Sequence, residues 1–272
     1  TLNDRRGLDE LDEPLVQSRI ARSTLDAIIE ACREAQPLMV RYFKAKAHAL
    51  GVEKLEWYDL GAPLGEEGPG VSYPAAQDLI VRQFGEFAPG MAAFAERALR
   101  ERWIEVEDRD GKRGGGFCTE VASRGETRIF MTWAANDKAP ATLAHELGHA
   151  FHADVLFERP VAQRRLPMTL AETASTFAEA LIREATRTQA TTSGARLRML
   201  DNSLQDAAAF LCNIPARFEL ERSFYAMRRL GPLSPDDLSA ATVRIYAEWY
   251  GGQLASIDDL FWARKLHFFI PA

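Results

Sequence analysis

The spacing of apolar residues predicts that most of the chain is helical. Across residues 15–50, apolar side chains recur every three or four positions, which is the period of one helix face. Pro37 is expected in the first turn of a new helix within this stretch. Residues 73–99 show the same period and are expected to form two helices that separate near Pro89. After Asn136 the pattern is helical again.

A short central stretch departs from this pattern. Residues 103–107 alternate weakly, and residues 117–121 and 127–133 are rich in strand-forming types, with a turn expected at residues 123–126. We therefore expect a hairpin at the edge of one small β-sheet. The predicted class is mainly α (α+β), and residues 1–272 are expected to form one compact domain.

Composition narrows the possible functions. The net charge of the 272 residues is −6, and no long run of lysine or arginine indicates a nucleic-acid surface. No apolar stretch reaches the ~18 residues of a membrane span. Three widely spaced cysteines argue against a disulfide framework and favour a cytoplasmic location. The chain lacks an initiator methionine and ends in an aromatic, apolar segment, so we expect a fragment or processed form.

One predicted helix carries the pattern of a metal site. Residues 141–152 read ATLAHELGHAFH, which contains the H-E-x-x-H motif His145-Glu146-Leu147-Gly148-His149. Residues four apart share a helix face, so both imidazoles can bind one ion, and neutral imidazole suits Zn²⁺. Glu146 would flank the ion and take a proton from its water. The alternative, a helix with two structural histidines, fits poorly with only five histidines in the chain.

The third ligand must come from outside the motif, because a catalytic zinc uses three protein ligands and one open position. Glu172 and Glu179 are seven residues apart on a helix predicted over residues 167–185, so one can bind zinc while the other orients an imidazole. Two alternatives stay open on spacing alone. Glu172 can cap the helix together with Thr169, and Glu179 can be a solvated helix residue. His152, just beyond the motif, is expected to face substrate or to be structural.

Several segments, taken in chain order, form a wider series. They are WYDL (57–60), GGGFCTEV to RIFMTW (114–133), TLAHELGHAFH (142–152), LAETASTFAEAL (170–181) and FELERSFYAMRRLGPLS (218–234). This series resembles the oligoendopeptidase F and thimet oligopeptidase family of zinc metallopeptidases. It covers nearly the whole chain, and the segments over residues 142–152 and 170–181 are the most specific part.

The resemblance implies a mainly helical, zincin-like catalytic domain whose deep cleft admits short unfolded peptides. It implies that Glu172 is the third zinc ligand and that Glu179 supports a ligand imidazole. It also suggests that the strand around Phe117 and Cys118 lines the cleft and pairs with the peptide backbone. His267 would match the family histidine that helps to stabilise the oxyanion on the scissile carbonyl.

Two departures from the family pattern concern the ends of the chain. Family members carry a further N-terminal helical region, and a tyrosine-rich segment follows the histidine that His267 resembles. The chain instead ends at Ala272, so we expect a catalytic domain truncated at both ends.

These observations predict a zinc-dependent endopeptidase with one Zn²⁺ per chain. Its partners would be short peptides rather than nucleic acid or membranes, and its oligomeric state is left open. Two alternatives stand beside this prediction. One is a catalytically impaired, zinc-binding peptide-binding fragment, and the other is a zinc carboxypeptidase.

Overall fold

The chain divides into two compact units, whereas the sequence led us to expect one compact domain. The structure, a computed structural model, describes residues 5–65 and 70–265. One unit comprises Thr1–Val16, Ile20–Glu66 and Arg196–Ala272, and the other comprises Gln17–Arg19 and Glu67–Ala195. Helices dominate both units, and the described residues form one three-stranded sheet, which confirms the mainly α class. That both units serve one catalytic domain stays a prediction.

The first unit is a helical assembly around a core of aromatic side chains. Phe43 stacks on Tyr250 with ring centroids 5.3 Å apart, and Tyr246 and Trp249 are almost fully buried beside them. Its elements are α2 (Asp12–Ser18), α3 (Arg22–Leu50), η1 (Trp57–Gly61), α10 (Ser193–Ala208), the π-helix η2 (Ala209–Asn213), α11 (Ile214–Leu230), α12 (Pro235–Trp249) and η3 (Phe261–Arg264). Helices α2 and α10 cross the boundary between the units by a few residues.

Helix α3 runs through Pro37 without interruption, so the expectation that Pro37 begins a new helix is wrong. An interior proline removes one helical hydrogen bond and costs about 3 kcal/mol or more. Burial of the residues that follow offsets this cost, because Met39, Phe43 and Ala47 all lie in the aromatic core. Tertiary packing therefore overrides the local signal of the proline.

A buried ion pair ties the first unit together. Lys46 on α3 lies 3.1 Å from Asp201 on α10, and both side chains are almost fully buried. Asp201 also accepts hydrogen bonds from the Tyr42 hydroxyl, the Gln205 amide and the backbone N–H of Leu64. Because the carboxylate has several donors, the buried charge is compensated. The network joins α3, α10 and the segment after η1.

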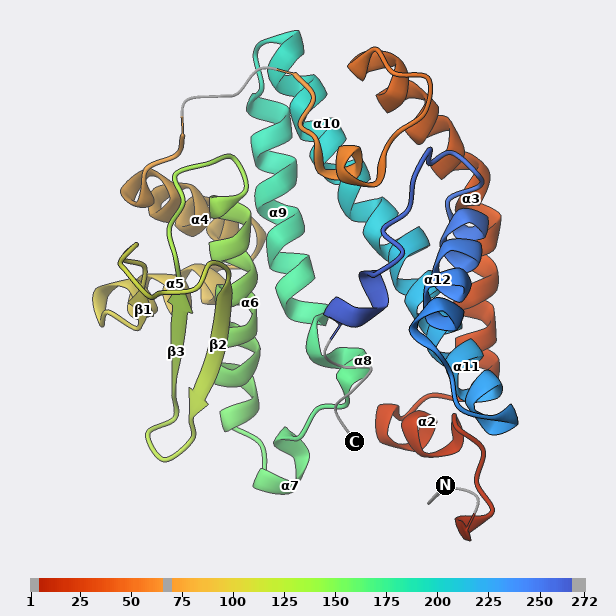
Figure 1. Cartoon of the computed structure of the whole chain (residues 1–272). Helices are drawn as coiled ribbons and strands as arrows, with labels where there is room; N and C mark the ends of the chain where they lie inside the picture. Colours follow the sequence, from red (N-terminus) through yellow and green to blue (C-terminus); the bar gives the residue numbers. More distant parts are fainter. Residues whose placement is uncertain (1–4, 66–69, 266–272) are drawn as a thin grey trace. The chain divides into compact units, whose positions relative to one another are not determined.

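The second unit packs one long helix between a sheet and a second helix (Figure 1). Strand β3 is central, with β1 parallel on one side and β2 antiparallel on the other, so β2 is an edge strand. The hairpin and the helix break near Pro89 are as predicted. The elements are α4 (Tyr73–Phe87), α5 (Pro89–Arg100), β1 (Ile104–Glu105), β2 (Gly116–Val121), β3 (Glu126–Met131), α6 (Ala139–Phe157), α7 (Val161–Arg164), α8 (Met168–Ala171) and α9 (Thr173–Gln189).

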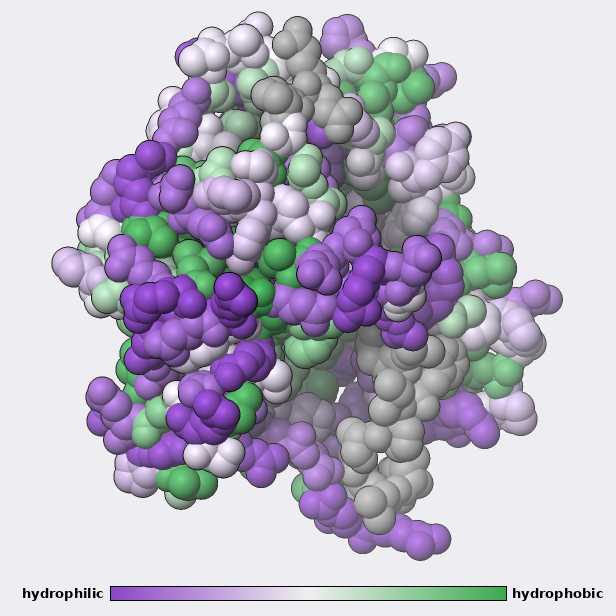
Figure 2. Space-filling view, turned by 90° about the vertical axis from the view of Figure 1, so that its left-hand side faces the viewer, coloured by the Kyte–Doolittle hydropathy of each residue, from purple (hydrophilic) through white to green (hydrophobic). Residues whose placement is uncertain are grey.

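The surface of the described chain offers no membrane-spanning element. None of the described helices is both long enough and apolar enough to cross a bilayer. Figure 2 shows a face of the molecule on which polar and charged residues predominate and apolar residues are scattered.

Helix α6 contacts α9 at unusually short range because of Gly148. Leu143 and Leu147 fill the core beside it and are fully buried. A Cβ atom at Gly148 would lie 2.7 Å from both the Ala174 carbonyl oxygen and the Ser175 Cα. These are backbone atoms, which cannot move aside as a flexible side chain can. Glycine at this position therefore sets the distance between the two helices.

We predict that Gly148→Ala destabilises the protein by about 1–3 kcal/mol, because the added methyl group overpacks the α6–α9 contact. Urea unfolding followed by circular dichroism measures the change. Gly90→Ala on α5 is the matched control, since its Cβ would meet nothing within 4 Å. The control is expected to be neutral or slightly stabilising. Equal stability of the two variants would show that α6 and α9 are not in such close contact.

Candidate metal centre and active site

Helix α6 presents both motif histidines on one face. The helix begins at Ala139 with Pro140 in its first turn, as predicted, and Asn136 accepts hydrogen bonds from the first backbone N–H groups. The ring centroids of His145 and His149 are 4.8 Å apart, with the ring planes nearly perpendicular. Each side chain is a quarter exposed. The two imidazoles are thus adjacent and accessible from the same side of the helix.

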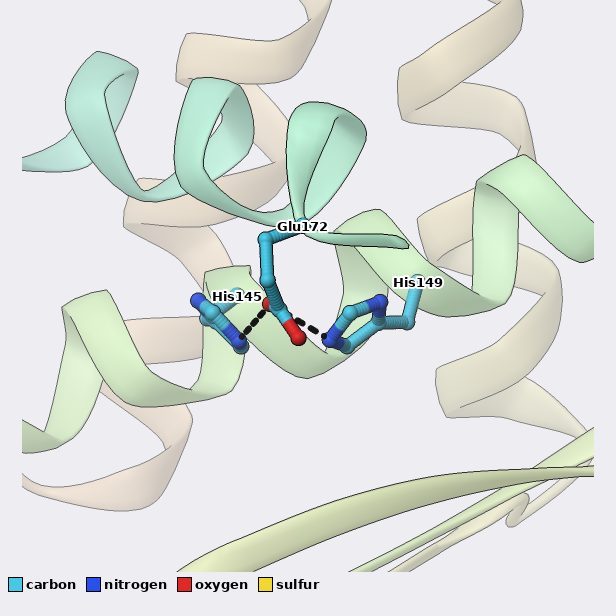
Figure 3. A group of neighbouring side chains, drawn as sticks. All are labelled: His145, His149 and Glu172. Carbon is cyan, nitrogen blue, oxygen red and sulfur yellow. Dashed lines mark ion pairs between the residues drawn. The ribbon is translucent and has the colours of Figure 1, made fainter. Parts of the chain in front are cut away.

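Glu172 reaches these imidazoles from the start of α9 (Figure 3). Its Oε2 atom lies 3.1 Å from Nε2 of His145 and 3.2 Å from Nε2 of His149. The Ser175 hydroxyl donates to the same oxygen at 2.8 Å. The three candidate ligand atoms lie within 4.8 Å of one another, and no other group of three such side chains is found among the described residues.

The helix predicted over residues 167–185 is interrupted at Glu172, which separates α8 from α9. The alternative role of Glu172 in a capping box with Thr169 is wrong, because Thr169 lies inside α8, whose N-cap is Pro167, and its hydroxyl donates to the Ser18 carbonyl. Glu172 itself makes no side-chain capping bond. The break leaves its carboxylate free to extend toward α6.

The geometry of these three residues suits a zinc ion. Ligand atoms at ~2.0–2.1 Å around a tetrahedral zinc lie about 3.4 Å from one another, close to the separations of 3.1 and 3.2 Å observed here. In the neutral tautomer whose Nδ1–H donates to Glu179, Nε2 of His145 presents a lone pair to the Glu172 carboxylate. In this tautomer two acceptors face each other, and they repel unless a cation lies between them. The donor set therefore fits a divalent metal.

Glu179 lies one layer behind the candidate ligands. Its Oε2 atom is 3.1 Å from Nδ1 of His145, so it contacts the ring nitrogen that faces away from Glu172. Burial raises the pKa of Glu179, but hydrogen bonds from His145 and Arg183 outweigh burial and hold the pKa below its usual value. Glu179 is thus a largely buried carboxylate that contacts both His145 and Arg183, rather than a solvated helix residue.

Glu146 points from α6 toward β2 and is only 6% exposed. A Cβ at Gly116 would lie 3.0 Å from Glu146 Oε1, so the glycine leaves the space that this carboxylate uses. Burial raises the pKa of Glu146, and the nearby Glu172 carboxylate adds to this while His145 opposes it. A buried carboxylate with a raised pKa is a stronger base than an exposed one.

The two histidines differ in basicity. The hydrogen bond that His145 donates to Glu179 raises the pKa of His145, against the opposite effect of burial. Burial lowers the pKa of His149, which has no comparable carboxylate partner on its second ring nitrogen among the described residues. His149 therefore favours the neutral form that metal binding requires.

A cavity of about 440 Å³ opens over the centre. Seven of the predicted site residues line it: His145, Glu146, His149, Glu172, His152, Phe117 and Cys118. Glu179 lies behind the lining. His267 falls outside the described residues, so its role stays a prediction. The structure thus brings together residues from β2, α6 and the start of α9.

Phe117 and Cys118 lie on opposite faces of β2, because side chains alternate along a strand. The Phe117 ring stacks on Phe130 of β3, with centroids 5.2 Å apart, on the face away from α6. Cys118 lies on the face toward α6. Burial, with the Glu146 and Glu120 carboxylates, raises the pKa of the Cys118 thiol to about 12. The thiol is therefore protonated at neutral pH and is not a nucleophile.

The sequence reasoning missed five of the residues that line the cavity, namely Gly116, Glu120, Ala153, Leu166 and Ala171. Strand alternation from Cys118 would have placed Gly116 and Glu120 on the same face, since both are two residues away from it. Leu166 lies between two short helices and had no such signal.

Comparisons with known proteins identify peptidases that this chain resembles. The sequence matches peptidase family M3 over residues 16–270. It is 25% identical to oligopeptidase PepF of Bacillus subtilis over 260 residues, which cover 94% of this chain and 39% of that protein. It is 26% identical to group B oligopeptidase PepB of Streptococcus agalactiae over 258 residues, which cover 92% of this chain and 42% of that protein. The chain therefore spans about two fifths of the length of these curated relatives.

Solved structures show the same fold. A Chlamydophila abortus protein named as a peptidase superposes with a TM-score of 0.80 at 21% identity, over 96% of this chain and 44% of its own. Oligoendopeptidase F from Enterococcus faecium superposes with a TM-score of 0.65 at 21% identity, over 98% of this chain and 41% of its own. Since the family match covers nearly the whole chain, the protein belongs to peptidase family M3.

Proposed function

We propose that this chain carries the catalytic centre of a zinc-dependent endopeptidase that hydrolyses short, unfolded peptides. The observation that carries the proposal is the convergence of His145, His149 and Glu172 on one point, with the buried Glu146 carboxylate beside them in the same cavity. The relatives, which are named as oligopeptidases and oligoendopeptidases, support peptides as the substrate class.

In this proposal, Nε2 of His145, Nε2 of His149 and a carboxylate oxygen of Glu172 hold the ion. When bound, zinc would polarise the scissile carbonyl and lower the pKa of water toward ~7. The Ser175 hydroxyl, which donates to Glu172 Oε2, restrains the carboxylate in the required direction. Glu179 holds the His145 ring in the orientation that turns Nε2 toward the centre.

Glu146 is the proposed general base. Its carboxylate accepts a proton from the water that attacks the peptide carbonyl, and it then delivers this proton to the leaving amine nitrogen. Burial against Gly116 supports this role in two ways, because it raises the basicity of the carboxylate and limits its rotation. Because Glu146 directly follows His145 on α6, its carboxylate lines the cavity on the side formed by β2.

The edge strand β2 is the proposed platform for the peptide. Among the described residues it pairs only with β3, so its outer backbone groups are available to an added strand. Cys118 and His152 contribute to the cavity from β2 and α6 and would contact substrate side chains. The Phe117 ring stacks on Phe130 instead, so its proposed contribution is through the backbone.

We predict that Glu146→Gln retains zinc but loses about 10²- to 10⁴-fold in peptidase activity, since the amide cannot accept the proton. Cleavage of a quenched fluorescent peptide, with and without a chelator, measures the change, and metal analysis confirms zinc content. Undiminished cleavage by the variant would remove Glu146 from the proposed role. A wild-type chain that binds zinc and peptide without cleaving would instead support the alternative of a catalytically impaired fragment.

Mass spectrometry of the products distinguishes the two peptidase types. An endopeptidase releases internal fragments from a peptide blocked at both ends, whereas a carboxypeptidase leaves that peptide intact. We expect internal cleavage.

We predict that Glu172→Ala weakens zinc binding more than about 100-fold. Loss of a group that only hydrogen-bonds to a metal ligand typically costs about 10- to 100-fold in affinity, and loss of a ligand itself should cost more. Competition with a chromophoric chelator measures the zinc affinity. Glu184→Ala is the matched control, because Glu184 lies on α9, which Glu172 precedes, and its carboxylate pairs at the surface with Arg187 and with no other side chain among the described residues. Equal zinc affinity of the two variants would mean that another group completes the site.

A further inference from the structure

Glu179 is held from two sides. Its Oε2 atom contacts Nδ1 of His145 at 3.1 Å. Its other oxygen, Oε1, accepts from Arg183 Nε at 2.9 Å and also from Arg183 Nη2. Arg183 is one helical turn after Glu179 on α9, which is the spacing at which side chains on a helix meet. The three residues form a continuous chain from guanidinium to carboxylate to imidazole.

The two contacts together restrict the carboxylate to one orientation. A glutamate side chain has three rotatable bonds, so a single contact with His145 leaves Glu179 able to turn toward solvent. Two N–H groups of Arg183 hold Oε1 and Nδ1 of His145 holds Oε2, so contacts at both oxygens together fix the orientation of the carboxylate. An imidazole oriented in this way presents Nε2 to Glu172.

A second ion pair on α9 provides a comparison. Arg187 Nε and Nη2 donate to the two oxygens of Glu184 at 2.8 and 2.6 Å, so this pair is also doubly bonded. Its side chains are about half exposed, and it contacts no candidate ligand. Pairs of this kind at the surface contribute little to stability. What distinguishes the Arg183 pair is its connection to His145.

Arg183 is connected, through Glu179, to one of the two candidate ligand histidines. Of the two candidate ligands on α6, His145 has a carboxylate on its Nδ1 atom, and His149 has none in the part of the chain that the structure describes. Glu179 therefore restrains the ring of His145 and not that of His149. A change at Arg183 should therefore reach the centre through His145.

We propose that Arg183 is a positioning residue of the metal centre, which fixes His145 through Glu179. The proposal rests on the proposed function in one respect, namely that His145, His149 and Glu172 bind zinc. It adds a residue that contacts neither the metal nor the substrate.

The test compares Arg183→Met with Arg187→Met in the full chain. We expect Arg183→Met to weaken zinc binding about 3- to 10-fold, below the about 10- to 100-fold typical for a group in direct contact with a ligand. It should also shift the visible absorption bands of the Co²⁺-substituted protein, which report ligand orientation. Arg187→Met should leave both unchanged. Arg183→Lys should restore part of the affinity, because lysine supplies the charge without the planar fork.

Zinc affinity within twofold of wild type in Arg183→Met, with unchanged Co²⁺ bands, would overturn the proposal. Equal weakening in Arg187→Met would do the same, because the effect would then be general to α9. If Arg183→Met fails to fold, the lysine variant decides, since unchanged affinity and bands there would contradict a role for the two-pronged contact. Failure of the proposed function gives a different result, because Glu172→Ala would then retain wild-type zinc affinity.

Discussion

The close contact between α6 and α9 at Gly148 is the constraint on which the centre depends. Two histidines on one helix supply only part of a zinc site, and the third ligand has to come from another element. Because Gly148 has no Cβ, the backbone at Ala174 and Ser175 can approach α6 directly. Glu172 lies immediately before this contact, and its carboxylate extends across to both imidazoles. A wider gap between the helices would separate Glu172 from the histidines even if every side chain were retained.

The same contact links three kinds of interaction in one small volume. Apolar burial of Leu143 and Leu147 anchors α6. The hydrogen bond from Ser175 to Glu172 and that from His145 to Glu179 restrain the groups that face the centre. Burial of Glu146 against the sheet raises the pKa of a carboxylate that solvent would otherwise stabilise in its charged form. A single glycine thus permits a packing arrangement that brings the three candidate ligands together and places a buried carboxylate beside them.

The sequence predicted the parts of the centre that follow from helix periodicity, and it was less informative about the rest. The shared face of His145 and His149 follows from spacing four along a helix, and the hairpin follows from residue type. Spacing could not separate Glu172 as a ligand from Glu172 as a cap, because both roles place a carboxylate near a helix start. The family resemblance favoured the ligand role, and in the structure the Glu172 carboxylate lies against both imidazoles.

Two features could not be predicted from local sequence signals. Pro37 lies inside α3 because burial of one helix face outweighs the local cost of the proline. The contact between Arg183 and Glu179 gave no signal, because an arginine one turn from a glutamate usually marks only a solvated pair. Packing between segments far apart in the sequence decides both. The most direct test of the centre is X-ray absorption at the zinc edge of the metal-loaded chain. Two imidazole nitrogens and a carboxylate oxygen at ~2.0–2.2 Å are expected, whereas a shell without imidazole scattering would contradict a zinc site at His145, His149 and Glu172.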